Sequence, residues 1–172
     1  FGANTITNSD GVLYAGIVTV TAKRIAADDP DLADLMPGGL LAEDKEGFTR
    51  VLGTLGMVAV ELRDDNGNEL NLADGAEATI QFPIVQSQLS EAPDQIALWS
   101  FDEAKGIWIE EGFATRQGNN YIGQVQHFSF WNCDAPFPLI HVCGTILNAD
   151  GTPAENISIE VVADVLYPTG YG

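Results

Sequence analysis

Apolar residues alternate with small or polar residues through most of this chain, and a period of two is the pattern of half-buried β-strands. A helix of one or two turns is predicted at 32–35, because acidic residues and a proline precede it and Pro37 with two glycines follows it. Strands are predicted at residues 11–25, 48–63, 69–73, 78–85, 96–101, 107–111 and 121–129. The pattern therefore predicts an all-β protein, an antiparallel β-sandwich with one short helix.

Glycine and proline residues predict how these strands connect. Asn66-Gly67 is a typical β-hairpin turn and returns the chain from 48–63 into 69–73. Pro83 indicates that 78–85 is an edge strand or contains a bulge, since proline cannot donate to a sheet ladder. The Asn66-Gly67 turn also has acidic and amide residues at alternate positions, as a calcium loop does. Its glycine falls two residues early and the bidentate glutamate is missing, so no metal site is predicted there.

Two prolines predict a domain boundary. Pro136 and Pro138 are expected to interrupt strand pairing, which divides the chain into a β-sandwich domain at 1–134 and a partial β-module at 135–172. The second segment contains a strand, an Asp150-Gly151 turn and another strand. Two strands cannot form a core of their own, so we expect this segment to be completed by more polypeptide or by another subunit.

Length and hydrophobicity narrow the class of protein. With 172 residues and 45% hydrophobic content, the chain can bury one good core. No apolar run reaches the roughly 18 residues needed to span a bilayer, so membrane insertion is not expected. The first residue is Phe1 rather than Met, which predicts a processed or excised segment and a secreted, extracellular location.

The charge of the chain limits its partners. A net charge of -18 opposes the phosphate neutralisation that nucleic-acid binding requires and the approach to anionic lipid. All basic residues precede Gln117, so the last third of the chain carries its acids without cationic partners nearby in sequence. The expected partners are therefore other subunits or neighbouring domains of the same protein, which includes a homopolymer.

The strongest candidate chemistry lies at 127–134, His-Phe-Ser-Phe-Trp-Asn-Cys-Asp, at the end of a predicted strand. Ser129 follows the carbonyl of Phe128, and His127 lies two residues upstream as a proton acceptor. On a strained backbone, the Ser129 hydroxyl can attack the Phe128–Ser129 bond and convert the amide to an ester. The alternative is that Phe128 and Phe130 share one buried face and leave His127 and Ser129 as ordinary outward polar residues.

The two cysteines are candidates for a disulfide. Cys133 and Cys143 stand ten residues apart across a bend that contains prolines, and this spacing can bring two strand ends within bridging distance. Two buried free thiols in adjacent strands would give the same sequence pattern. Zinc binding is not expected, because two cysteines and an isolated His141 lack the paired spacing of zinc ligands. No cofactor is predicted.

The tryptophans have two interpretations. Trp99 and Trp108 face each other across the predicted 96–111 hairpin and are expected to pack together in the core. Exposed indoles at Trp99, Trp108 or Trp131 would instead stack on sugar rings, as in carbohydrate-binding modules. That second interpretation requires at least one exposed indole face.

The His-Phe-Ser motif resembles that of the ZU-type β-sandwich, the fold of netrin-receptor and ankyrin supramodules, some of which cleave their own chain there. The chain is more closely similar to extracellular modules of cartilage intermediate layer protein and of large secreted proteins from Bacteroidetes-like bacteria, through a hairpin from Trp99 to Gly112. Residues 142–161 resemble the opening of a carboxypeptidase-regulatory-like, transthyretin-like module. The resemblance implies that Ser129 is the nucleophile, Phe128 supplies the attacked carbonyl, and His127 accepts the proton or sets the strain.

Three functions follow from these observations. The first is a non-enzymatic structural or adhesive module of a bacterial surface protein or fibre, assembled by strand pairing between subunits. The second is an autoproteolytic domain that cleaves Phe128–Ser129 once, and the third is a carbohydrate-binding module. A Ser-His-acid triad cannot be assembled with confidence from the two histidines His127 and His141, so multiple-turnover catalysis is not expected.

Overall fold

The alternating segments form ten antiparallel and parallel strands in the computed structural model, which describes residue 2, residues 4–138 and residues 143–158. The strands are β1 (Ile6–Asn8), β2 (Thr19–Ile25), β3 (Leu41–Glu43), β4 (Thr49–Arg63), β5 (Glu69–Leu72), β6 (Ala78–Pro83), β7 (Gln95–Asp102), β8 (Ile107–Gln117), β9 (Asn120–Val125) and β10 (Phe130–Pro138). Two short helical segments, α1 (Leu32–Leu35) and η1 (Gln86–Gln88), lie between them.

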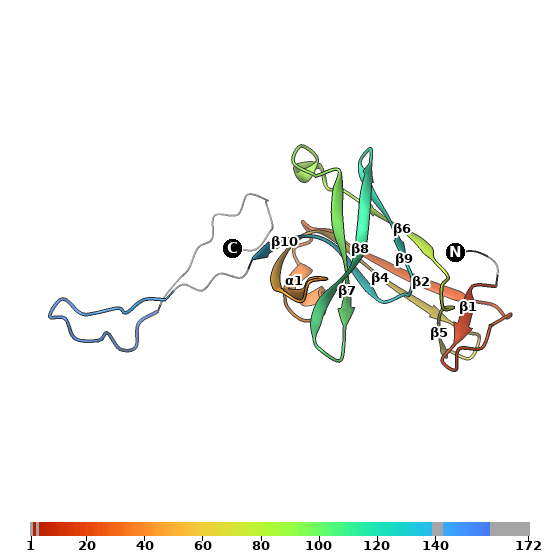
Figure 1. The fold of residues 1–172 in the computed structure, drawn as a ribbon, viewed down its shortest axis with the longest axis horizontal. Coiled ribbons are helices and arrows are strands. Elements are labelled where there is room, and N and C mark those ends of the chain that lie inside the picture. The colour runs from red at the N-terminus through yellow and green to blue at the C-terminus, as the bar shows by residue number, and fades with distance from the viewer. Residues whose placement is uncertain (1, 3, 139–142, 159–172) are drawn as a thin grey trace.

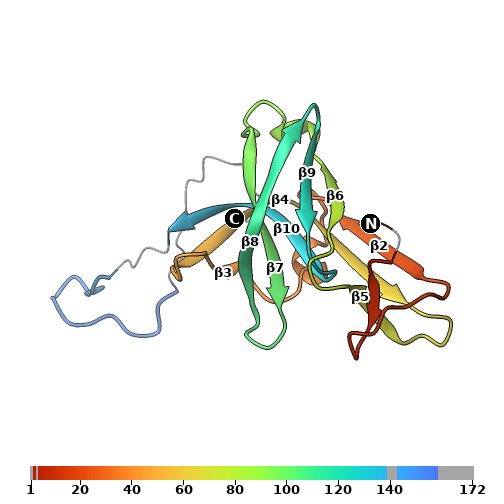
Figure 2. The ribbon, with the colours of Figure 1, turned by 45° about the vertical axis from the view of Figure 1, so that its right-hand side comes forward.

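The strands form one continuous sheet that curls into a sandwich. Its order is β1-β5-β4-β10-β7-β8-β9-β6, with β2 paired to β4 and β3 paired to β4 and β8. Figures 1 and 2 show that β2, β4 and β10 run along the long axis, while β6, β7, β8 and β9 cross them steeply. The all-β sandwich with a short helix is therefore confirmed, and its pairings are antiparallel apart from that of β3 with β8.

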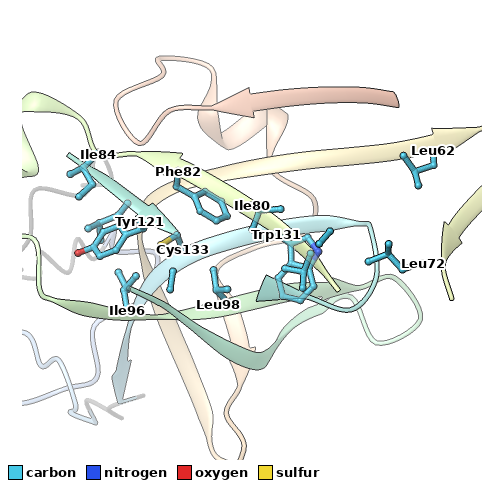
Figure 3. Close-up of a cluster of buried hydrophobic side chains, with 14 of the residues drawn as sticks. Leu62, Leu72, Ile80, Phe82, Ile84, Ile96, Leu98, Tyr121, Trp131 and Cys133 are labelled. Carbon is cyan, nitrogen blue, oxygen red and sulfur yellow. The ribbon is translucent and has the colours of Figure 1, made fainter. Parts of the chain in front are cut away.

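The first hydrophobic cluster fills the space inside the curled sheet (Figure 3). Trp131, Tyr121 and Leu98 are its large buried members and expose 1% or less of their surface. Burying a large aromatic or aliphatic side chain contributes about 1.5–3 kcal/mol, so these residues are central to stability. Other members come from β9, β10 and five further strands: Ile6, Leu55, Leu62, Leu70, Leu72, Ile80, Phe82, Ala114, Val125 and Cys133.

The second cluster lies on the opposite face of the central strands. Trp99 and Trp108 are fully buried there, with Ile25, Met57 and the short helix α1 packed around them. Phe101 contacts Trp108 edge-on, with ring centroids 5.2 Å apart. The central strands β4, β7 and β10 are thus covered on both faces, which explains why β10 buries four successive residues from Trp131 to Asp134.

A bulge in β4 connects the two clusters. Asn132 pairs with Met57 and Asp134 with Thr54, so one extra residue is inserted on the β4 side. Gly56 lies in this interval with φ +136°, a backbone conformation that favours glycine. The insertion reverses the alternation of β4, so that Leu55 faces the first cluster while Met57 faces the second.

Several predicted boundaries are wrong. The strand predicted at 11–25 is β2 alone, since residues 9–18 form a turn and a loop after the short β1. The strand predicted at 121–129 is also shorter, because β9 ends at Val125 and a turn follows. The turn at 64–68 and the edge position of β6, which ends at Pro83, are confirmed. The parts of the predicted C-terminal strands at 139–142 and beyond residue 158 lie outside the described residues.

The two prolines do not interrupt β10. The strand continues through Pro136 and Pro138 and pairs with β4 as far as Arg50. Prolines two residues apart direct their missing N–H groups to the same side of a strand. Pairing with β7 is described only for Trp131–Asp134, so that side needs no donor further on. The sandwich therefore extends past the boundary expected at residue 134.

Candidate functional site

The turn at residues 126–129 joins β9 to β10 and carries the candidate nucleophile. Because it is a turn, the strand alternation expected for Phe128 and Phe130 does not apply. Phe128 packs partly buried against the first cluster and Phe130 partly buried against the second. The prediction that both rings share one buried face is therefore wrong.

His127 pairs with a glutamate that the sequence did not reveal. Its Nε2 lies 3.0 Å from Oε2 and 3.2 Å from Oε1 of Glu111 on β8. The Ser100 hydroxyl donates to the same carboxylate at 2.5 Å. The hydrogen bond from His127, assisted by Ser100, lowers the pKa of Glu111 although partial burial opposes this. The His127 imidazole is thus held in place by both carboxylate oxygens of Glu111.

The neighbouring Trp131 also contacts the His127 ring. The rings of His127 and Trp131 lie 4.9 Å apart with a tilt of 38°. The Trp131 indole N–H donates to the His127 carbonyl at 3.1 Å. A buried indole thereby satisfies its polar atom and closes the turn at the same time.

Asn71 of β5 clamps the backbone of Phe128. The Phe128 N–H donates to Asn71 Oδ1 at 2.7 Å, and Asn71 Nδ2 donates to the Phe128 carbonyl at 3.3 Å. A side-chain amide has one acceptor and one donor group, which match the N–H and the carbonyl of one residue. The carbonyl that self-cleavage would attack is therefore already hydrogen-bonded.

The Ser129 hydroxyl is directed away from that carbonyl. It donates to the carbonyl of Phe130 at 3.1 Å, and the Ser129 carbonyl accepts from Val60 N–H at 3.1 Å. Positive φ at non-glycine residues occurs only at Asn4 and Asn156 within the described chain, so the turn has no strain of that kind. The structure brings His127, Phe128 and Ser129 together in one turn, in which the Ser129 hydroxyl binds the Phe130 carbonyl and the His127 imidazole binds Glu111.

The segment after the turn contains a buried polar cluster at the β4 bulge. Thr54 Oγ1 donates to Asn132 Oδ1 at 3.0 Å and accepts from Gly56 N–H at 3.1 Å. Gln88 Nε2 donates to the Thr54 carbonyl at 3.2 Å. These side chains replace ladder bonds that the bulge removes, because buried backbone groups need partners.

Asp134 is the acid of this cluster and is completely buried. Asn132 Nδ2 donates to Asp134 Oδ2 at 2.6 Å, while Oδ1 has no hydrogen-bond partner in the part of the chain that the structure describes. Burial raises the pKa of Asp134 well above the ordinary carboxyl range, although the nearby Thr54 hydroxyl and Leu55 backbone amide lower it in part. The raised pKa favours a neutral Asp134 carboxyl group with a structural role.

The two cysteines do not form the predicted disulfide. Cys133 and Cys143 are both free, with Cys133 buried and Cys143 exposed. Burial raises the pKa of the Cys133 thiol well above its usual value, so it is unreactive.

Trp99, Trp108 and Trp131 expose 1% or less of their surface, so none offers a face to a sugar ring. The sugar-stacking role predicted for these three indoles is therefore wrong.

A shallow hollow adjoins the Glu111–His127 pair on the outer face of β8 and β9. It has a volume of about 500 Å³ and is lined by Glu77, Glu111, Phe113, Thr115 and Gln124, among others. Phe113 is 56% exposed there, beneath the ammonium of Lys45 at 5.1 Å.

No group of three or more metal-ligating side chains occurs among the described residues. Within the same residues, no helix has the length and apolar character needed to cross a membrane.

Comparison with protein-family models, curated proteins and solved structures gives no match. The interpretation of the site therefore rests on its own geometry.

Sequence reasoning missed three partners of the site. Asn71 lies 57 residues before Phe128, Glu111 lies 16 residues before His127, and Thr54 lies 78 residues before Asn132. Each is brought in by sheet pairing rather than by local sequence. The only local signal is Gly56, an isolated glycine in a strand pattern, which is typical of a bulge.

Proposed function

We propose that the chain is a non-enzymatic structural or adhesive module of an extracellular surface protein or fibre, and that it assembles with other copies through exposed strand surfaces. The observation that carries this proposal is the apolar, exposed N-terminal flank of the sandwich. Val12, Leu13, Ile17 and Val20 expose between 50% and 70% of their surface. Contiguous exposed apolar residues at a strand edge are typical of interaction surfaces.

The strand β2 supports this interpretation. Residues Thr19 to Arg24 are all exposed, and the pairing described for β2 is with β4 alone. An exposed strand with one described partner offers backbone donors and acceptors to another chain. The net charge of -18 keeps such a chain soluble until a specific contact forms.

Light scattering across a concentration series tests the proposal. We expect the mass to rise above that of one chain as the concentration is increased. Val20→Lys places a charge on the exposed β2 surface and should shift association to higher concentration. A chain that stays monomeric throughout, with or without Val20→Lys, contradicts assembly.

Self-cleavage is a second candidate, favoured by the Asn71 bond to the Phe128 carbonyl. A donor at this oxygen would stabilise the oxyanion formed when Ser129 Oγ attacks. The Ser129 nitrogen would leave as an amine, and water would then hydrolyse the ester to give a Phe128 carboxylate and a free Ser129 hydroxyl. The hydroxyl would first have to rotate away from the Phe130 carbonyl. Mass spectrometry of the denatured chain tests this, since fragments 1–128 and 129–172 would favour cleavage over a purely structural role.

A further inference from the structure

Two segments of the chain repeat each other at a constant separation of 140 residues. The N-terminal hairpin (residues 4–18) and the C-terminal hairpin (residues 144–158) both carry the pattern Thr-Ile-x-Asn-x-Asp-Gly, followed six residues later by Ile. The identical pairs are Thr5/Thr145, Ile6/Ile146, Asn8/Asn148, Asp10/Asp150, Gly11/Gly151 and Ile17/Ile157.

The two hairpins also have the same backbone hydrogen bonds. Both have an isolated antiparallel bridge, Thr7 with Leu13 and Leu147 with Pro153. Both turns have glycine at positive φ, +75° at Gly11 and +84° at Gly151. The N-terminal bonds are Asn8 N to Val12 O (3.0 Å), Gly11 N to Asn8 O (3.0 Å) and Tyr14 N to Ile6 O (2.9 Å). The C-terminal bonds are Asn148 N to Thr152 O (2.8 Å), Gly151 N to Asn148 O (2.9 Å) and Ala154 N to Ile146 O (3.0 Å).

The environments of the two hairpins differ. The N-terminal hairpin contributes β1, which pairs with β5 through Ile6–Leu72, Thr7–Asn71 and Asn8–Leu70. Ile6 is only 5% exposed there, whereas its counterpart Ile146 is 47% exposed. The segment 143–158 lies apart from the sandwich in both views (Figures 1 and 2). The same element is thus present once on its binding strand and once without it.

We propose that the C-terminal hairpin binds β5 of a second copy of the chain, in place of that copy's own N-terminal hairpin. This deepens the proposed structural function by naming the partner and the contact. Ile146, Leu147 and Asn148 then pair with Leu72, Asn71 and Leu70 in the register that β1 uses. Exchange of an identical element between protomers needs no new surface, because the chain already contains both the element and its site.

The chain's own hairpin is the competitor for this site. It is tethered to β5 at an effective concentration of about a millimolar, and its Tyr14 and Val18 pack against the first cluster. The C-terminal hairpin has the smaller Ala154 and Ser158 at those positions. The exchanged state is therefore the minor one in dilute wild-type protein, and weakening the N-terminal hairpin should promote it.

Matched glycine substitutions test the proposal with opposite signs. A Cβ atom added at Gly11, Gly151 or Gly47 meets no atom within 4 Å, and each of these glycines has positive φ. Valine at any of these positions is expected to lower the equilibrium constant for forming that turn about tenfold, which equals about 1.4 kcal/mol, without disturbing the core. Gly47, in the turn between β3 and β4, is the control because it lies outside both hairpins.

Self-association is measured by sedimentation and light scattering at about 0.3 M salt, which screens the charge of the chains. Gly11→Val should lower the dissociation constant about tenfold, and Gly151→Val should raise it about tenfold. Gly47→Val should leave it unchanged, and the Gly11→Val/Gly151→Val double variant should lie close to wild type. As a stronger pair, Ile146→Asp should abolish association, while Phe48→Asp, at a residue 61% exposed outside both hairpins, should preserve it.

The outcomes separate this inference from the broader proposal. One outcome is that Val20→Lys weakens association while Gly11→Val and Gly151→Val change the dissociation constant by the same amount in the same direction. That outcome would overturn hairpin exchange and leave the structural function standing. Absence of association in every variant, including Gly11→Val, would overturn both forms of assembly.

Discussion

The turn at 126–129 and the strand segment at 131–134 are separated by one residue, yet they contribute differently. The turn holds the candidate nucleophile. Its His127 side chain and Phe128 backbone bind partners from distant strands, whereas the Ser129 hydroxyl donates to the adjacent Phe130 carbonyl. The strand segment is buried on both faces and carries Trp131, Cys133 and Asp134. The turn residues, which have the most suggestive chemistry, therefore serve to connect β9 to β10, while the buried residues at 131–134 contribute most of the stability.

Removal of Trp131 should have the largest effect on the strand side of this comparison. Its indole is 1% exposed and its N–H closes the turn on His127. Trp131→Ala should lower the free energy of unfolding by about 3–5 kcal/mol, as for other large-to-small core changes. Denaturant unfolding measures this, with Phe113→Ala on the exposed surface as a control expected within about 0.5 kcal/mol. A loss below about 1 kcal/mol would show that Trp131 is not core.

Removal of the Asn71 clamp should have the next largest effect, on the turn side. Asn71→Ala leaves the Phe128 N–H and carbonyl without this partner, and losing a partner for half-buried groups costs about 1–3 kcal/mol. The exposed Asn119→Ala is the matched control, expected within about 0.5 kcal/mol. Equal unfolding free energies for the two variants would mean that the clamp does not hold the turn.

Asp134→Asn should change how stability depends on pH. Burial raises the folded-state pKa of Asp134, while the unfolded carboxyl titrates near about 3.9. The native state therefore binds more protons, so the free energy of unfolding falls as pH rises above about 4. The variant lacks this loss and should exceed wild type by about 1 kcal/mol or more at pH 8, with little difference near pH 4. Urea titrations across this range measure it, and a difference independent of pH would contradict a raised pKa.

Ser129→Ala should have the smallest effect. The hydroxyl donates only to the adjacent Phe130 carbonyl, so its loss should change stability by less than about 0.5 kcal/mol. Any intramolecular cleavage should disappear in the same variant. Two fragments that persist in Ser129→Ala would indicate an external protease.

The sequence predicts the fold class better than the site. Alternation and the Asn66-Gly67 turn lead directly to β4, β5 and their hairpin, because these features act through local geometry. Within the strand predicted at 11–25, residues 11–18 form a loop in which Val12, Leu13 and Ile17 face solvent, and alternation alone does not distinguish such a loop from a strand. The short β3 depends on pairing with both β4 and β8. Partners such as Asn71 and Thr54 require the register of the whole sheet, which no local pattern contains.

The arrangement of β4 and β10 has a mechanical consequence. The strand β1 and the end of β10 lie at opposite ends of the sandwich, and β4 and β10 run between them (Figure 1). A pull between these ends acts parallel to the two strands, so the ladder from Phe130–Ala59 to Pro138–Arg50 is sheared rather than peeled. In shear the rungs share the load together, and β10, the strand that follows the 126–129 turn, becomes the tension member of the module.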